Sequence, residues 1–269
     1  MRLIAAILVL TSVVVFPAAH AGEPVEYTRF LIPVYSPDLP GAFGSLWQAR
    51  TWLRYSGDVD ADIVPRPFCF GIQCPLGGVL EPGWPSVPFQ TLAGFPESAI
   101  LVHVDSRYAS RVTFESRIRD LSRSSESAGT EVPVIREDRI ANAPVYLLNV
   151  PLDVWFRHTL RVYALPEIES PEVEIRYFRQ PDDSGSRLDL DITLLKAERL
   201  HLRTRRDFPT YQLYPSVGEV GNFQLAPELA GQERIWIEVV PVTPGLRIWA
   251  FASVTNNETQ EVTLVTPSL

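Results

Sequence analysis

The chain has 269 residues, of which 46% are hydrophobic and 21% charged, with 24 prolines, two cysteines and a formal net charge of −8. This composition is that of an ordinary globular protein, and it excludes a disordered chain, a collagen-like repeat and a small cysteine-stapled protein. The acidic charge also argues against nucleic acid as a partner, because binding to nucleic acid depends mainly on basic side chains that neutralise phosphates.

Residues 1–21 have the features of a cleaved signal peptide. Arg2 precedes an apolar run from Leu3 to Phe16, and Ala19-His20-Ala21 matches the small-x-small pattern of a cleavage site. The run is shorter than the roughly 20 apolar residues that span a bilayer, and no later segment is longer. We therefore expect a periplasmic, cell-surface or secreted protein with no transmembrane segment in the mature chain.

Cys69 and Cys74 predict a loop clamped by a disulfide. Two thiols in an exported chain usually form a disulfide, and Pro67 and Pro75 bound the loop that this pair would close. Two alternatives are weaker. A metal site needs about four ligands and no histidine lies nearby, whereas a redox pair usually has a two-residue spacer.

The mature chain is interrupted by proline so often that long helices have little room, because a proline inside a helix costs about 3 kcal/mol. Between the prolines lie short segments with the two-residue alternation of strands. In the first half these segments are Thr28–Tyr35, Ser45–Tyr55, Val59–Val64, Ser98–Val104, Arg111–Asp120, Val132–Arg136 and Pro144–Val150. Ser56-Gly57-Asp58 predicts a hairpin turn between the second segment and the third.

Arg111–Arg123 is the one segment in which a helix competes with a strand. Phe114, Ile118 and Leu121 have the spacing of a helical stripe. Val112, Phe114 and Ile118 also fit most of a strand alternation, and the strand-rich surroundings favour the strand.

The second half contains a similar series of strand-like segments. They are Thr159–Leu165, Glu172–Phe178, Leu188–Leu195, Arg199–Arg203, Glu219–Leu225, Glu233–Val240, Leu246–Thr255 and Glu261–Thr266. Asn256-Asn257-Glu258 predicts a hairpin turn before the last of them. About seven or eight regularly spaced strands in each half are typical of a β-sandwich.

The sequence thus predicts an all-β protein with two consecutive antiparallel sandwich domains, Ig-like or jelly-roll-like. The first domain would cover residues 22–152 and carry the cysteine loop, and the second would cover residues 153–269. We expect the seam within Val150–His158 and an apolar interface, with Trp155 and Phe156 packed at the junction.

The beginning and the end of the chain resemble secreted bacterial sandwich proteins of unknown activity. Arg29–Val34, Pro40–Trp47 and Thr51–Leu53 follow their pattern of a first strand, a glycine-rich turn, Ser-x-Trp and a polar–apolar strand. Leu246–Thr259 looks like their closing hairpin. The resemblance implies the fold and export, and it brings no functional residue to this chain.

Two acidic segments are candidate calcium sites, since calcium prefers several carboxylate oxygens together. Asp58, Asp60 and Asp62 have the ligand rhythm of a calcium loop, but Ile63 stands where such a loop needs glycine, and no glutamate follows at the right distance. The same run also fits a strand with its aspartates in water and its apolar residues, Val59, Ala61 and Ile63, toward a core.

Asp182 and Asp183, with Asp189 and Asp191, surround the Ser184-Gly185 turn and could line a second calcium loop. Asp189 and Asp191 also alternate with apolar residues, as on an outward strand face. Calcium is the leading cofactor candidate, although the absence of any cofactor is the favoured interpretation.

Arg199, Arg203 and Arg205 lie with His201 on one face of a predicted strand. They could bind an anionic polysaccharide or a phosphate group through charge-assisted hydrogen bonds. The favoured alternative is a surface strand whose charges pair across the sheet with acidic neighbours. Candidate neighbours are Glu172, Glu174, Asp189 and Asp191.

Trp236, Trp249 and Phe251 each lie on the face of a predicted strand opposite its aliphatic residues. If that face is exposed, the aromatic rings could stack on sugar rings, as in carbohydrate-binding sandwiches. The alternative is that they pack beneath the other domain or a loop, which is the commoner fate of tryptophan.

Catalytic motifs are missing from the sequence: it has no Gly-x-Ser-x-Gly, no His-Glu-x-x-His and no phosphate-binding glycine loop. Paired carboxylates that meet only in three dimensions would escape a sequence search. The favoured hypothesis is a non-catalytic exported protein with a binding or structural role. The alternatives are a carbohydrate-binding or carbohydrate-active protein that contacts a polysaccharide, and an assembly subunit that pairs with another exported protein through edge strands.

Overall fold

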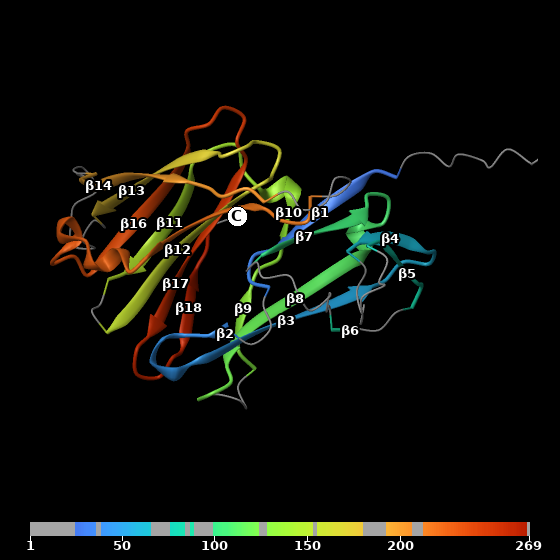
Figure 1. Cartoon of the computed structure of the whole chain (residues 1–269), viewed down its shortest axis with the longest axis horizontal. Coiled ribbons are helices and arrows are strands. Elements are labelled where there is room, and N and C mark those ends of the chain that lie inside the picture. The colour runs from blue at the N-terminus through green and yellow to red at the C-terminus, as the bar shows by residue number, and fades with distance from the viewer. Residues whose placement is uncertain are drawn as a thin grey trace, which may run out of the picture.

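The structure is a computed structural model, and it describes residues 25–35, 39–65, 76–83, 87–88, 99–123, 128–152, 155–179, 192–205 and 212–267. The described residues form β-strands and five short 3₁₀ turns, with no α-helix among them. The strands make four antiparallel sheets, which we call A to D (Figure 1). The predicted all-β class is confirmed.

Sheets A and B are built from the first half of the chain. Sheet A has the order β10 (Ile135–Arg136), β1 (Tyr27–Ile32), β7 (Ile100–Asp105), β4 (Ala61–Val64) and β5 (Gly78–Leu80). Sheet B has the order β2 (Leu39–Pro40), β3 (Leu46–Tyr55), β8 (Val112–Asp120) and β9 (Thr130–Val132), with β6 (Val87–Pro88) paired to β3. The 3₁₀ turns of this half are η1 (Ala42–Gly44), η2 (Ala109–Arg111) and η3 (Glu137–Arg139).

Sheets C and D are built from the remaining strands. Sheet C has the order β15 (Ser216–Gly221), β12 (Phe156–Ala164), β17 (Ile248–Asn256) and β18 (Val262–Val265). Sheet D has the order β11 (Val145–Pro151), β16 (Arg234–Pro241), β13 (Glu172–Arg179) and β14 (Leu194–His201). The turns η4 (Phe223–Leu225) and η5 (Pro227–Leu229) follow β15.

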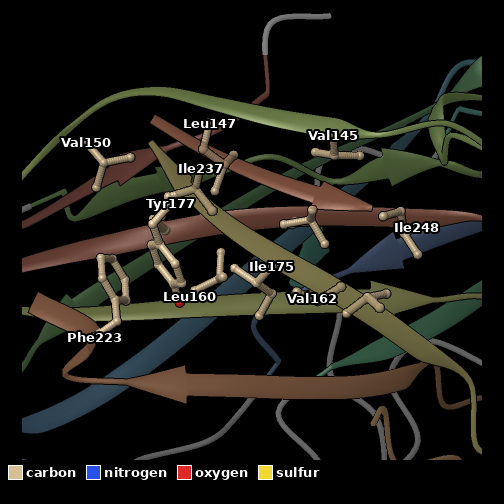
Figure 2. Packing of buried hydrophobic residues seen from close by; sticks show 14 of the residues in the cluster. Val145, Leu147, Val150, Leu160, Val162, Ile175, Tyr177, Phe223, Ile237 and Ile248 are labelled. Carbon is tan, nitrogen blue, oxygen red and sulfur yellow. The ribbon is translucent and has the colours of Figure 1, made fainter. Parts of the chain in front are cut away.

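Each pair of sheets encloses a hydrophobic core, because alternate residues of every strand point to the same face. In β13 the alternation is strict: Val173, Ile175 and Tyr177 are fully buried, and the residues between them are partly exposed. They meet Leu160 and Val162 from sheet C (Figure 2). Burying each such aliphatic side chain contributes about 1.5–3 kcal/mol to stability. Two sandwiches, A with B and C with D, follow from these cores.

A third core joins the two sandwiches. Trp249 and Phe251 of β17 and Tyr163 of β12 project from the side of sheet C that faces away from sheet D, and they pack against Leu31 and Leu101 of sheet A. Sheet C is therefore covered on both faces, and β17 is buried along most of its length. The interface is apolar, as the sequence predicts, and we call it the joint core.

The seam between the sandwiches differs from the predicted position. β11 pairs with β16 in sheet D, so it belongs to the C-terminal sandwich rather than to a domain ending at residue 152. The chain leaves sheet A after Arg136 and enters sheet D at Val145. Trp155 is 71% exposed and Phe156 is half-buried, so the expectation that Trp155 packs at the junction is wrong.

The later half of the chain also contributes to the first sandwich. Leu213 and Tyr214 are buried in the core between sheets A and B. The backbone N–H of Leu101 on β7 donates to the carbonyl of Leu213 at 2.7 Å. The two sandwiches are thus not consecutive, self-contained blocks of sequence.

Three local predictions have clear outcomes. The predicted segment Arg111–Asp120 is a strand from Val112 onward, β8, whose pairing with β3 buries Val112 and Ser116, and the helical alternative is wrong. The turn at Asn256-Asn257-Glu258 joins β17 and β18 as expected. Ser56-Gly57-Asp58 is not a hairpin turn, since β3 belongs to sheet B and β4 to sheet A.

Candidate functional site

Two of the three candidate aromatics are inaccessible. Trp249 is 2% exposed and Phe251 1% exposed, and both lie in the joint core. Tyr163 stacks on Phe251 with ring centroids 6.1 Å apart and an interplanar angle of 13°. The interpretation that Trp249 and Phe251 bind a ligand at the surface is wrong, and the alternative that they pack beneath the other domain is confirmed, because sheet A covers the face of sheet C from which they project.

Trp236 lies apart from that pair, on the outer face of sheet D, and it is half-buried. Its ring stacks on Phe178 with a centroid distance of 4.1 Å and an angle of 11°. Tyr146 lies at 6.0 Å and 42° on the neighbouring strand β11. Because Phe178 covers one face of the indole, that face is closed to a sugar ring.

The outer face of sheet D carries further exposed apolar side chains around this stack. Tyr146 is 43% exposed, Leu148 53% and Leu194 51%. Leu194 is the cross-strand partner of Phe178, which places it on the same face. The stack is therefore part of an apolar band across the sheet.

The candidate arginines of the predicted basic strand do not form one ligand-binding face. Arg199 lies on β14 opposite Glu174 and forms an ion pair with Glu172 at 3.4 Å. The cross-strand pairing that the sequence favours is confirmed for this residue. Arg203 lies beyond β14 and bridges to Val217 through its backbone. The guanidinium of Arg205 lies over the ring of Tyr214, 4.9 Å from its centroid.

The first candidate calcium site is a pair of exposed aspartates and one half-buried aspartate. Asp58 and Asp60 are exposed, whereas Asp62 is half-buried on β4. Within the described ranges, no group of three or more histidine, cysteine or acidic side chains is arranged to hold a metal ion. Two other candidate pairs, Asp182 with Asp183 and Cys69 with Cys74, lie outside the described residues.

Arginines gather instead on the outer face of sheet B, where a shallow groove of about 190 Å³ is lined by Arg50, Trp52, Arg117, Arg119 and Ala128. Strand alternation explains this placement. On β3, Thr51, Leu53 and Tyr55 turn toward the core, so that the intervening residues point outward. We call this feature the arginine groove.

The register of β3 and β8 places two positive charges side by side. Arg50 is the direct cross-strand partner of Arg117, and Trp52 is the partner of Glu115. Directly opposed side chains in an antiparallel pair have Cβ atoms about 5 Å apart. Trp52 is 37% exposed, so part of the indole is open to solvent beside the two guanidinium groups.

Hydrogen bonds orient the guanidinium groups in the arginine groove. The side-chain oxygen of Gln48 accepts from Nε of Arg50 at 2.7 Å and from Nη2 of Arg119 at 3.3 Å. Nε of Arg117 donates to Glu115 at 2.7 Å. That hydrogen bond, with the charges of Glu115 and Glu131, raises the pKa of Arg117. Among the described residues, Arg50 has no carboxylate at ion-pair distance.

None of the groove residues is among the candidates that the sequence suggests. Alternation in β3 indicates that Arg50 and Trp52 share an outward face, which is the one signal that a sequence offers here. The pairing of Arg50 with Arg117 joins positions 67 residues apart and depends on the register of two distant strands.

Comparisons with known proteins found no relative. No family model matches the chain, and neither a curated protein nor a solved structure matches it. Within the described part of the chain, no helix is long and apolar enough to cross a membrane.

Proposed function

We propose that this protein is an exported, non-catalytic binding protein of the Ig-like or jelly-roll-like class, and that it holds an anionic ligand in the arginine groove of sheet B. The observation that carries the proposal is the direct cross-strand pairing of Arg50 with Arg117. Like charges opposite each other destabilise a sheet, typically by a few tenths of a kcal/mol to about 1 kcal/mol. The ion pair of Arg117 with Glu115 offsets part of that repulsion, and an anion held between the two guanidinium groups would offset the rest. The features of residues 1–21 support export.

The chemistry of the groove supports binding rather than acid–base catalysis. Arginine stays protonated at physiological pH, so Arg50, Arg117 and Arg119 can hold an anion but do not exchange protons with it. Each guanidinium offers a planar fork of donors that matches the oxygens of a carboxylate, sulfate or phosphate. The net charge of −8 makes such a concentration of arginines a local feature, not a property of the whole surface.

Affinity electrophoresis tests this function. We expect the mature protein to be slowed in gels that contain polygalacturonate or dextran sulfate, but not in gels that contain neutral dextran. The double variant Arg50→Gln/Arg117→Gln should lose this retardation, measured relative to a gel without polymer. Arg199→Gln removes an exposed arginine from sheet D and is the matched control, which should be retarded like the wild type.

Two results would contradict the proposed function. One is a wild-type protein that neither anionic polymer retards. The other is a double variant that is retarded as strongly as the wild type. Circular dichroism of each variant checks that the β-sheet content is retained.

A further inference from the structure

We infer that the ligand of the arginine groove is an acidic polysaccharide, a chain of sugar rings that carry carboxylates, with one ring seated against Trp52. This inference rests on the proposed function and narrows it, because an anion alone would need only the arginines. Three features of the groove favour an acidic sugar over other anions: oriented guanidinium groups, an exposed indole, and carboxylates that accept hydrogen bonds.

The first feature is the fixed orientation of the guanidinium groups. Gln48 holds Arg50 and Arg119 through one shared oxygen, and Glu115 holds Arg117 through its Nε. Orientation matters because a guanidinium recognises a carboxylate with two parallel hydrogen bonds only when the two planes align. Within the described part of the chain, the hydrogen bonds from Arg50 and Arg117 use Nε, so the terminal nitrogens of those two residues can contact a ligand.

The second feature is the apolar surface beside the charges. Trp52 lies two residues from Arg50 on the same face of β3, and 37% of its surface is exposed. The C–H face of a sugar ring packs on an indole while the hydroxyls at the ring edge reach polar neighbours. An inorganic anion or a lipid phosphate has no ring that would use this surface.

The third feature is the pair of carboxylates around the arginines. Glu115 is the cross-strand partner of Trp52, and Glu131 is the partner of Arg117. Ionised carboxylates accept hydrogen bonds and therefore suit the hydroxyl donors of a sugar. They repel a ligand whose groups are all anionic acceptors, above all duplex DNA with one phosphate charge per about 1.7 Å. A uronic acid chain carries one carboxylate and several hydroxyls on each ring, which matches the mixed groove.

Isothermal titration of the mature wild-type protein with trigalacturonate, neutral galactotriose and citrate, a carboxylate ligand without a sugar ring, tests the inference. We expect trigalacturonate to bind and galactotriose not to bind. Arg50→Gln/Arg117→Gln should weaken binding of both anionic ligands by about tenfold or more, since charge-assisted hydrogen bonds are lost. Trp52→Ala should weaken trigalacturonate about fivefold, because only a sugar ring packs on the indole, and should leave citrate binding, which involves no ring, within about twofold.

Trp236→Ala serves as the matched aromatic control, since it removes a tryptophan from sheet D and should leave trigalacturonate binding unchanged. The sugar inference is overturned if Trp52→Ala binds trigalacturonate like the wild type, or if Trp236→Ala is the variant that loses binding. It is also overturned if duplex DNA or phosphatidylglycerol vesicles bind more tightly than trigalacturonate. In these cases the proposed function stands as long as the double arginine variant fails to bind the anion. Failure of the wild type to bind any of the anions overturns both.

Discussion

The hydroxyl of Tyr163 on β12 donates a 2.7 Å hydrogen bond to the backbone carbonyl of Pro33, 130 residues earlier in the chain. Tyr163 is fully buried, and burial raises the pKa of its phenol well above the usual value. The bond crosses the joint core, so it connects the C-terminal sandwich to the N-terminal one. It is a polar contact within the joint core, and Thr130 on β9 adds a second one by donating to the carbonyl of Val262 on β18.

We predict that Tyr163→Phe lowers the free energy of unfolding by about 1–3 kcal/mol, because the buried carbonyl of Pro33 loses its hydrogen-bond partner. Urea denaturation followed by tryptophan fluorescence measures the change. Tyr146→Phe is the control, since Tyr146 is 43% exposed and its loss of a hydroxyl should have a smaller effect. Equal stability of Tyr163→Phe and the wild type would mean that the bond across the joint core contributes nothing.

We predict that Trp249→Ala destabilises the protein by about 3–5 kcal/mol, the range for a large aromatic removed from a packed core. Trp236→Ala should lower the free energy of unfolding by less, since Trp236 is half-buried and part of its ring already contacts solvent. Thermal unfolding of the two variants side by side measures the difference. A larger loss for Trp236→Ala would contradict the position of the joint core.

Strand β17 shows how far the sequence predicts this fold. Alternation correctly predicts a strand there, and it separates Ile248 and Ala250 from Trp249 and Phe251. The stretch is apolar on both faces, however, and such runs are typical of strands that are covered on both sides. The sequence therefore indicates that β17 is covered on both faces. Which residues cover it, such as Leu31 and Leu101, depends on long-range packing.

The arginine groove is a feature that the sequence alone does not predict. Outward positions on β3 follow from local alternation, but the register that sets Arg50 against Arg117 is a long-range property. Candidates drawn from single strands, such as Arg199 with Arg203 and Arg205, share a local pattern. The structure separates them because β14 ends at His201. Local periodicity indicates which face a residue occupies and not which distant residue stands beside it.

We predict that stability falls as the pH decreases below about 6.5, and that His103 is one cause. Burial lowers the pKa of His103 from its ordinary value of 6.5, and the charge of Arg29 lowers it further. The carbonyl of Gln212, 3.0 Å from Nε2, and the carboxylate of Glu137 act in the opposite direction. The ring of Tyr27 lies edge-on at 6.2 Å.

The direction of this pH dependence follows from proton binding in the folded and unfolded states. Because the folded pKa lies below the unfolded one, the unfolded chain binds more protons as the pH falls through 6.5, and unfolding becomes easier. The contribution of His103 to stability is fully present above pH 6.5 and is lost progressively below it. Urea midpoints between pH 8 and pH 5 measure the effect, and His103→Gln should flatten the curve. A wild-type curve and a variant curve of the same slope would rule out His103 as the cause.

The disulfide between Cys69 and Cys74 stays a prediction. We expect that alkylation of the mature protein, denatured but not reduced, labels neither cysteine. After reduction both should react, because reduction of one disulfide releases two thiols. Full labelling of the unreduced protein would show free thiols and would contradict the prediction of a loop clamped by a disulfide.

We expect the outer face of sheet B to hold an acidic sugar, and a crystal structure of the mature protein with trigalacturonate would show this. That structure should place a sugar carboxylate at hydrogen-bond distance from the guanidinium groups of Arg50 and Arg117, with the ring packed on Trp52. A trisaccharide bound elsewhere, for example beside Arg199 or Trp236 on sheet D, with the arginine groove empty, would contradict it.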